Sequence, residues 1–178
     1  MRTFRSILTV VAACAAMLTS GIAGAEGNAR FKPGTENIAA TAIAINAQSG
    51  EFSTLLAALT CTDLVPAVAD PDVRLTVFAP TDAAFLAALG VDDESVCTID
   101  KALLTSVLLL HVTEGRRLSP SVINGRNKQI ETLNGGFLFP VGSGSLTIDA
   151  TGSSANIVIP DVLASNGVIH AIDFVLLP

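Results

Sequence analysis

Apolar residues recur every three or four positions through the first half of the chain, and this spacing predicts helices. The predicted helices run from Ile38 to the break at Ser49-Gly50, from Phe52 to Leu59, from Asp82 to Gly90 and from Asp100 to His111. Side chains at this spacing share one face, so each helix should bury a stripe. The expected stripes include Ile38, Ala39, Ala42, Ile43 and Ile45; Phe85, Leu86 and Leu89; and Leu103, Leu104, Val107, Leu108 and His111.

The second half of the chain alternates short apolar segments with turn-forming residues, a pattern typical of strands. The expected strands are residues 129–133, 137–141, 146–149 and 156–160, and an earlier strand, residues 75–79, precedes Pro80. Glycine-rich segments between them supply the conformations that tight turns need. Helices followed by strands, without regular alternation, predict an α+β domain.

The final stretch, residues 161–178, contains the most apolar of the predicted strands. Residues 168–177 are apolar at almost every position, so both faces of this strand should be covered by other elements. Asn166 and Gly167 precede it and should form a turn, because both residues tolerate positive φ. The C-terminus is therefore expected to be tied into the core.

Few polar residues occupy positions that suggest catalysis or ligand binding. Thr81 and Asp82 occupy a helix N-cap position, where side-chain oxygens accept hydrogen bonds from the first N–H groups of a helix. His111 lies on the apolar stripe of its helix and His170 within the buried strand, so both are expected to be structural and bonded to backbone. The spacing of the two histidines favours neither a metal site nor a catalytic triad.

The first residues of the chain have the features of an export signal. Arg2 and Arg5 precede an apolar segment, and Ala25 ends a small-residue cleavage site. We expect a signal peptide over residues 1–25, too short to remain as a membrane span, then a flexible leader over 26–37 and one domain over 38–178.

A lipoprotein signal is the alternative interpretation of the N-terminus. Val11-Ala-Ala-Cys14 has the form of such a signal, in which Cys14 would be acylated and retained. The apolar region before Cys14 is short, and the apolar stretch continues past it, which favours a cleaved signal peptide. The expected location is therefore secreted or periplasmic.

Cysteine content agrees with export. Once Cys14 is removed, Cys61 and Cys97 remain, and an oxidising compartment favours a disulfide between them. Such a bridge would contribute roughly 4 kcal/mol on the chain-entropy estimate. The alternative, two free thiols or a metal-binding pair, is disfavoured by the absence of C-x-x-C spacing and the few histidines.

Charge and aromatic content narrow the choice of partners. The net charge of −6 becomes more negative when Arg2 and Arg5 are lost with the signal peptide, so contact with nucleic-acid phosphates is not expected. No basic amphipathic helix suggests adsorption to an anionic membrane. The chain has no Trp and no Tyr, so stacking on a sugar ring would fall to Phe.

Three segments, in this order and spacing, resemble the fasciclin-like domain. They are residues 75–85 (LTVFAPTDAAF), residues 103–112 with Gly115 after them, and residues 161–178. Together with the segments between them they cover nearly all of the predicted domain. The resemblance implies a β-wedge of sandwich-like strands packed with several helices, a secreted or surface location, a role in adhesion or matrix contact, and no enzymatic activity.

The resemblance also implies contact positions. In animal members, integrin contact involves a tyrosine–histidine pair and an aspartate–isoleucine pair. The matching positions here are Leu110-His111 and Asp161-Val162. The tyrosine is replaced by leucine and the isoleucine by valine, which points to a different partner.

Two functional hypotheses follow. The first is a secreted, non-enzymatic module that binds an extracellular or cell-surface protein or polysaccharide, without a cofactor or a metal. The second is a carrier that holds a small hydrophobic ligand in an apolar cavity among the helices, which the 50% content of hydrophobic residues permits. A hydrolase is a distant third hypothesis, because no serine lies in a G-x-S-x-G context.

Overall fold

The computed structural model describes residues 34–123, 129–141, 147–150 and 153–177. The predicted signal peptide, with Cys14, and most of the predicted leader lie outside these residues. The described helices are α1 (Ile38–Ser49), α2 (Ser53–Cys61), α3 (Val65–Ala69), α4 (Asp82–Leu89), α5 (Lys101–Leu110) and α6 (Ser119–Ile123), with a 3-10 turn, η1, over Val96–Thr98. The described strands are β1 (Leu75–Pro80), β2 (Val112–Glu114), β3 (Ile130–Glu131), β4 (Phe137–Val141), β5 (Thr147–Ala150), β6 (Ser153–Ala164) and β7 (Gly167–Ile172).

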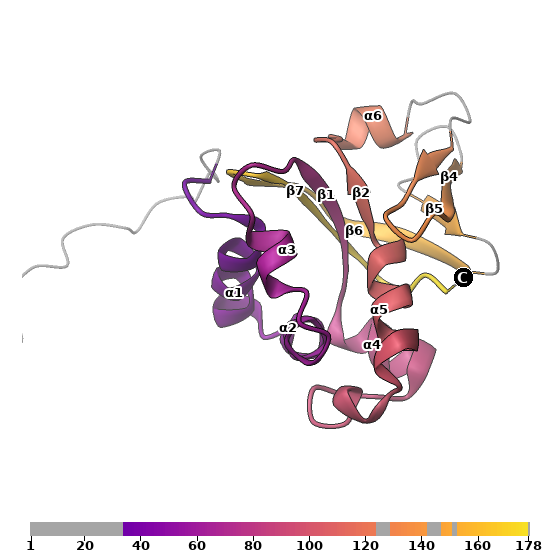
Figure 1. The fold of residues 1–178 in the computed structure, drawn as a ribbon. Helices are drawn as coiled ribbons and strands as arrows, with labels where there is room; N and C mark the ends of the chain where they lie inside the picture. The colour runs from indigo at the N-terminus through magenta and orange to yellow at the C-terminus, as the bar shows by residue number, and fades with distance from the viewer. Residues whose placement is uncertain (1–33, 124–128, 142–146, 151–152, 178) are drawn as a thin grey trace, which may run out of the picture. The chain divides into compact units, whose positions relative to one another are not determined.

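These strands form one sheet in the order β2-β1-β7-β6-β5-β4-β3 (Figure 1). The last strand of the chain, β7, lies inside the sheet, parallel to β1 and antiparallel to β6. All six residues of β7 are buried. The α+β class and the burial of the final strand are therefore confirmed.

The two faces of the sheet pack against different apolar clusters. Along β1, Val77 and Ala79 belong to a cluster shared with helices α1, α2, α4 and α5, whereas Phe78 points into a second cluster with Leu138 and Ile172. Successive side chains of a strand point to opposite faces. The single strand β1, with the sequence LTVFAP, therefore contributes side chains to both apolar clusters.

The terminal strands of the sheet, β2 and β3, approach each other. The Leu133 N–H donates to the carbonyl oxygen of Val112 at 2.8 Å. The Thr113 hydroxyl donates to the carbonyl oxygen of Glu131 at 2.6 Å. These two bonds close the curled sheet around the second cluster, which also takes in Val122 of α6.

Helix ends follow local sequence. The side chains of Asn37, Thr81 and Asp100 cap α1, α4 and α5 by accepting from backbone N–H groups of the first turn. Gly50 and Gly90 end α1 and α4 in the left-handed conformation, which glycine adopts without a Cβ penalty. The predicted capping role of Thr81 is confirmed.

Asp82 caps a helix other than its own. Its carboxylate accepts from the N–H groups of Ser53 and Thr54, at 3.3 and 2.9 Å, at the start of α2. No side chain of α2 itself caps that end. The same carboxylate lies in the first turn of α4, where the helix dipole also favours a negative charge. Asp82 thus joins the N-termini of two helices.

Three residues predicted to be buried are exposed instead. Ile43, Leu86 and Leu103 expose 55%, 62% and 54% of their surface. Their helices carry Ala or Leu on several sides, so spacing alone does not decide which side meets the sheet. The predicted stripes were therefore too wide.

β2 and α6 were not predicted. β2 follows α5 after a single residue, His111, and α6 occupies residues 119–123, which the sequence indicated as loop. Both are fixed by contacts with distant segments.

The last two strands differ in length from the prediction. β6 continues through Pro160, because shifts in its register against β7 absorb that residue, and Asp161 takes a φ of 58°. β7 ends at Ile172, before the predicted end at Leu177. The chain bends there, and the Asp173 carboxylate accepts from the backbone and side-chain N–H groups of Asn156 at 2.7 and 2.9 Å.

The turn before β7 forms as predicted, but for a different reason. Neither Asn166 nor Gly167 has a positive φ. Gly167 is required by space, because a Cβ at this position would lie 2.0 Å from the carbonyl oxygen of Leu75 and 2.7 Å from Cδ1 of Ile38. The pair therefore permits β7 to lie directly against β1.

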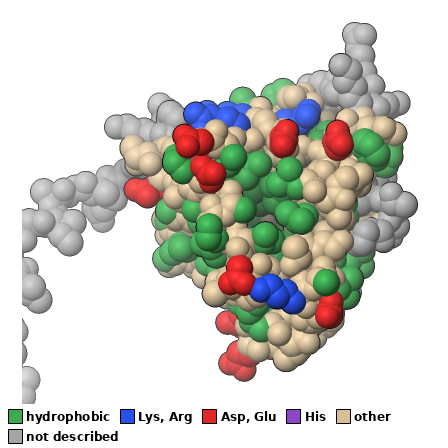
Figure 2. Space-filling view, in the orientation of Figure 1, with side chains coloured by type: hydrophobic (Ala, Val, Ile, Leu, Met, Phe, Trp, Pro, Cys, Tyr) green, Lys and Arg blue, Asp and Glu red, His purple; other side chains and the backbone are tan. Residues whose placement is uncertain are grey.

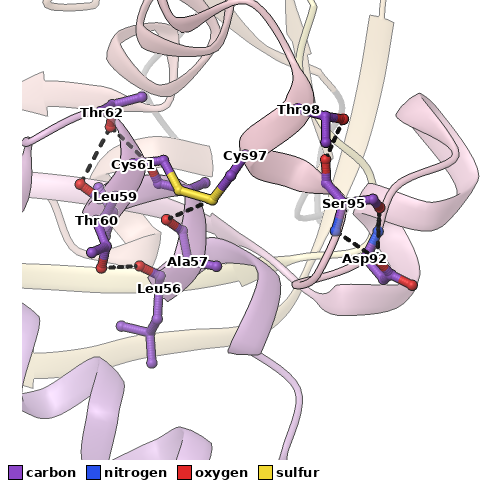
Figure 3. The surroundings of a disulfide bond; sticks show 11 residues. Leu56, Ala57, Leu59, Thr60, Cys61, Thr62, Asp92, Ser95, Cys97 and Thr98 are labelled. Carbon is purple, nitrogen blue, oxygen red and sulfur yellow. Dashed lines mark hydrogen bonds between the residues drawn. A yellow bond between two sulfur atoms is a disulfide. The ribbon is translucent and has the colours of Figure 1, made fainter.

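Cys61 and Cys97 form a disulfide, with their Cα atoms 5.7 Å apart (Figure 3). It joins the end of α2 to η1. The two cysteines are 36 residues apart in sequence, and the loop that they close contains α3, β1 and α4. This prediction is confirmed.

Replacing Gly167 with alanine should destabilise the protein by about 3 kcal/mol or more, because the added methyl group meets the β1 backbone and not a flexible side chain. Gly135→Ala is the matched control. Gly135 has a φ of 78° with open space around it, so only left-handed strain of about 1–2 kcal/mol is expected. Urea denaturation measures both values, and equal losses would contradict the close-approach explanation.

Candidate functional site

An apolar cavity of about 270 Å³ opens on the face that carries the helices. Its walls come from α1, α2, α3 and α5, with β1 and β2 behind them. The lining side chains include Leu55, Leu59, Val77, Leu108 and Val112. Figure 2 shows hydrophobic side chains around a hollow in the middle of this face, with acidic and basic side chains above and below it. Such a cavity suits an apolar ligand.

The lining contains three residues with titratable side chains, Asp70, Glu114 and His111. Asp70 follows α3, and Glu114 ends β2 opposite Leu75. The Asp70 carboxylate accepts from the Asp72 N–H at 2.9 Å. The Asp70 carbonyl oxygen and the Leu75 N–H both bond to Asn166, and Glu114 pairs with Leu75. Both acidic residues therefore lie near the start of β1, at one end of the cavity.

Asn166 holds that end of the cavity together. Its side-chain oxygen accepts from the Ile38 N–H at 2.8 Å, and its amide nitrogen donates to the carbonyl oxygens of Val68 and Asp70 at 3.0 and 2.8 Å. All three partners line the cavity. The side chain of Asn166 is completely buried, and each of its hydrogen bonds ties a different segment of the wall to the β6–β7 turn.

His111 closes the back of the cavity and is bonded at both ring nitrogens. Nδ1–H donates to the carbonyl oxygen of Val107 at 2.7 Å, and Nε2 accepts from the Leu176 N–H at 2.9 Å. Burial lowers the pKa of His111 to about 4, against a smaller opposing effect of the Val107 bond. The ring is therefore neutral and joins α5 to the C-terminal segment.

His170 is arranged in a similar way on β7. Its Nδ1 accepts from the Asp161 N–H at 3.1 Å, and Nε2–H donates to the carbonyl oxygen of Arg117 at 2.8 Å. The ring stacks on Phe78, with centroids 5.5 Å apart. Burial lowers the pKa of His170. Both histidines are hydrogen-bonded to the backbone, as predicted.

A serine, an aspartate and a histidine meet at the β6 bulge, but without the order of a catalytic triad. The Ser119 N–H and hydroxyl both donate to the Asp161 carboxylate. His170 contacts the backbone N–H of Asp161 and not its carboxylate. In a triad the imidazole stands between the hydroxyl and the carboxylate, whereas here the hydroxyl bonds to the carboxylate directly and the imidazole bonds to backbone.

The four contact positions implied by the family resemblance lie largely inside the fold. Leu110 and His111 are buried, and Val162 forms part of the floor of a second cavity of about 220 Å³ beside the end of α1. Asp161 is half-buried, and both carboxylate oxygens are engaged by Ser119. Of the four side chains, Asp161 alone is therefore partly accessible.

The described part of the chain contains no group of three or more His, Cys, Asp or Glu side chains placed to hold a metal ion. None of its helices has both the length and the apolar character needed to cross a membrane.

The family follows from comparison with known proteins. The Fasciclin domain model matches residues 50–178, and the chain belongs to this family. Protein sll1483 of Synechocystis sp. is 37% identical over 142 residues, which cover 79% of this chain and 74% of that protein.

Two mycobacterial proteins are also similar. The cell surface glycolipoprotein MPT83 of Mycobacterium tuberculosis is 35% identical over 130 residues, covering 67% of this chain and 54% of that protein. The immunogenic protein MPT70 of the same species is 36% identical over 135 residues, covering 72% and 64%. This chain therefore spans between one half and two thirds of each.

A solved structure was also found, a FAS1 domain pair from the insect cell adhesion molecule Fasciclin I. Its TM-score is 0.49 at 24% identity, and the match covers 58% of this chain and 36% of that chain.

The neutral state of His111 predicts a loss of stability in acid. An unfolded histidine takes up a proton below about pH 6.5, whereas folded His111 stays neutral down to about pH 4. The contribution is therefore full above pH 6.5 and is lost as the pH falls toward 4, by roughly 3 kcal/mol from this residue. Urea denaturation across this range measures it.

His111→Gln is the control for that prediction. The amide keeps an acceptor for the Leu176 N–H but does not titrate. The variant should be less stable near neutral pH and should lose stability less steeply on acidification, while His170 remains in both proteins. Parallel pH profiles for the two proteins would contradict the assignment.

Proposed function

We propose that this chain is an exported, non-enzymatic binding module that contacts an extracellular or cell-surface partner, a protein or a polysaccharide. The sequence of residues 1–25, with cleavage after Ala25, supports release into the periplasm or the medium. The similarity to MPT83, a cell surface glycolipoprotein, supports a location outside the cytoplasm.

The observation that carries this proposal is a pair of exposed phenylalanines on β4. Phe137 and Phe139 expose 41% and 37% of their surface, while Leu138 between them is fully buried. Alternation along the strand places both rings on the face opposite Leu138. Exposed aromatic rings are common anchors in binding surfaces, and the chain has no Trp or Tyr to fill that role.

The internal use of reactive side chains supports binding without turnover. His111 and His170 are bonded to backbone at both nitrogens, and Asp161 receives two bonds from Ser119. A general base needs a free lone pair aimed at a substrate proton. These four residues are committed to the fold.

The double variant Phe137→Ala/Phe139→Ala should weaken binding to the host's own envelope polysaccharide or surface proteins at least ten-fold, because interface aromatic side chains often contribute more than 1 kcal/mol each. Co-sedimentation with isolated envelope material measures the affinity. The melting temperature should change by only a few degrees, since both rings are partly solvated.

Leu86→Ala is the matched control, because Leu86 is an exposed apolar residue on α4. It should leave the affinity unchanged. Equal effects of the two substitutions, or unchanged affinity in the double variant, would rule out β4 as the contact surface.

A second function is favoured by the apolar cavity. The protein would carry a small hydrophobic ligand, held between α1–α3 and α5 against β1. The cavity is close to the lower end of the range of about 300–1,000 Å³ typical of ligand pockets. Its walls are fixed by Asn166 and by the packing of β1, so the cavity is formed before any ligand arrives.

Native mass spectrometry of protein purified from its own host tests the carrier function. The expected result is a mass above that of the mature polypeptide, with the excess lost on denaturation. Ala67→Trp should reduce the retained fraction, because Ala67 is an exposed residue of the cavity lining. A bare polypeptide mass in wild-type protein would count against a carrier.

A further inference from the structure

We infer that the cavity selects an apolar molecule with a positively charged head group. The apolar part would occupy the space between α2, α5 and β1, and the head group would lie beside Asp70 and Glu114. This inference rests on the carrier function and specifies the chemistry of its ligand.

The body of the cavity offers apolar contact alone. Beyond Asp70, Glu114 and His111, every lining residue has a hydrocarbon or aromatic side chain. His111 gives no hydrogen bond to a ligand in this arrangement, because Val107 and Leu176 occupy its two nitrogens. A buried polar group of a ligand would find no partner there, at a cost in affinity. The ligand body must therefore be apolar.

The end of the cavity near the start of β1 is acidic. Asp70 and Glu114 are the charged residues of the lining, and the lining includes no lysine or arginine. The nearest cation in sequence, Arg74, donates from Nη1 to the carbonyl oxygens of Pro71 and Val73, which holds its guanidinium against its own loop. A cationic head group would therefore meet two carboxylates, and an anionic head group would be repelled.

The backbone positions of these two residues are fixed by the fold. The Asp70 carbonyl oxygen accepts from the buried amide of Asn166 at 2.8 Å, and Asp70 Oδ1 accepts from Asp72 N–H. Glu114 belongs to β2, in register with Leu75 of β1. The acidic end therefore stays beside the apolar body without a loop rearrangement.

The expected selectivity is modest, because Glu114 is exposed and Asp70 half-exposed. Solvent-exposed ion pairs contribute between about 1.5-fold and five-fold each to an equilibrium constant. Two carboxylates acting together should favour a cation over an anion of the same chain length by roughly five-fold. The preference should shrink as salt is added, because salt screens exposed charges.

A displacement assay separates the apolar body from the head group. The probe is N-phenyl-1-naphthylamine, an uncharged fluorophore. Its fluorescence can be read without background from Trp or Tyr, since the protein has neither. Three competitors share one ten-carbon chain, decyltrimethylammonium, decanol and decanoate, each below its micelle-forming concentration. We expect decyltrimethylammonium to displace the probe at a concentration roughly five-fold lower than decanoate, with decanol between them.

Variants assign the effect to the cavity. Ala67→Trp should abolish probe binding, whereas Ala87→Trp, an exposed alanine of α4 outside the lining, should leave it unchanged. Asp70→Asn/Glu114→Gln should bring the cation-to-anion ratio close to one without weakening decanol. Asp93→Asn/Glu131→Gln makes the same change in net charge at exposed residues outside the lining and should keep the ratio.

The outcomes are distinguishable. If the probe does not bind wild-type protein, the carrier function fails and the inference with it. If the probe binds and Ala67→Trp excludes it, but decanoate competes as well as decyltrimethylammonium, the carrier function stands and the head-group inference is overturned. A ratio that falls equally in both double variants would also overturn it, because it would reflect net charge and not the cavity.

Discussion

The buried carboxamide of Asn166 is the contact on which the arrangement of helices over the sheet depends. It joins the first N–H of α1, the carbonyl of Val68 in α3 and the carbonyl of Asp70 after it. The backbone carbonyl oxygen of Asn166 accepts from Leu75 N–H at the start of β1. No hydrocarbon side chain could satisfy these groups, and a buried group left unpaired costs about 1–3 kcal/mol. The start of α1, the end of α3 and the start of β1 thus meet the β6–β7 turn at one residue.

This contact also explains why the protein has a cavity where a solid core would be expected. The helices α1 and α3 are held at the β6–β7 turn by Asn166, and α2 is held to α4 by Asp82. The positions of the helices are set by polar contacts at their ends and by the disulfide at Cys61. The apolar side chains between α2 and α5 therefore do not need to pack completely to hold the helices in place, and the cavity remains between them.

Local sequence predicted the elements whose boundaries are encoded by caps and glycines. The ends of α1 and α4, the capping role of Thr81 and the burial of β7 all follow from residues within a few positions. The unpredicted features depend on distant partners. Asp82 caps α2 across 28 residues, β2 exists because it pairs with β1, and the exposure of Leu103 depends on where the sheet lies. The cavity itself joins segments from Ile38 to Ile169, so no local pattern could reveal it.

The bonds between β2 and β3 have a further consequence for a protein that acts outside the cell. An open sheet presents a row of unpaired N–H and C=O groups that can recruit a strand from another molecule and start aggregation. Here the Val112 carbonyl oxygen accepts from the Leu133 N–H, and the Thr113 hydroxyl donates to the Glu131 carbonyl oxygen. At these positions the edges formed by β2 and β3 satisfy each other's backbone groups. Self-association through strand addition at this margin would first require the two strands to separate, which would open the apolar cluster around Phe78.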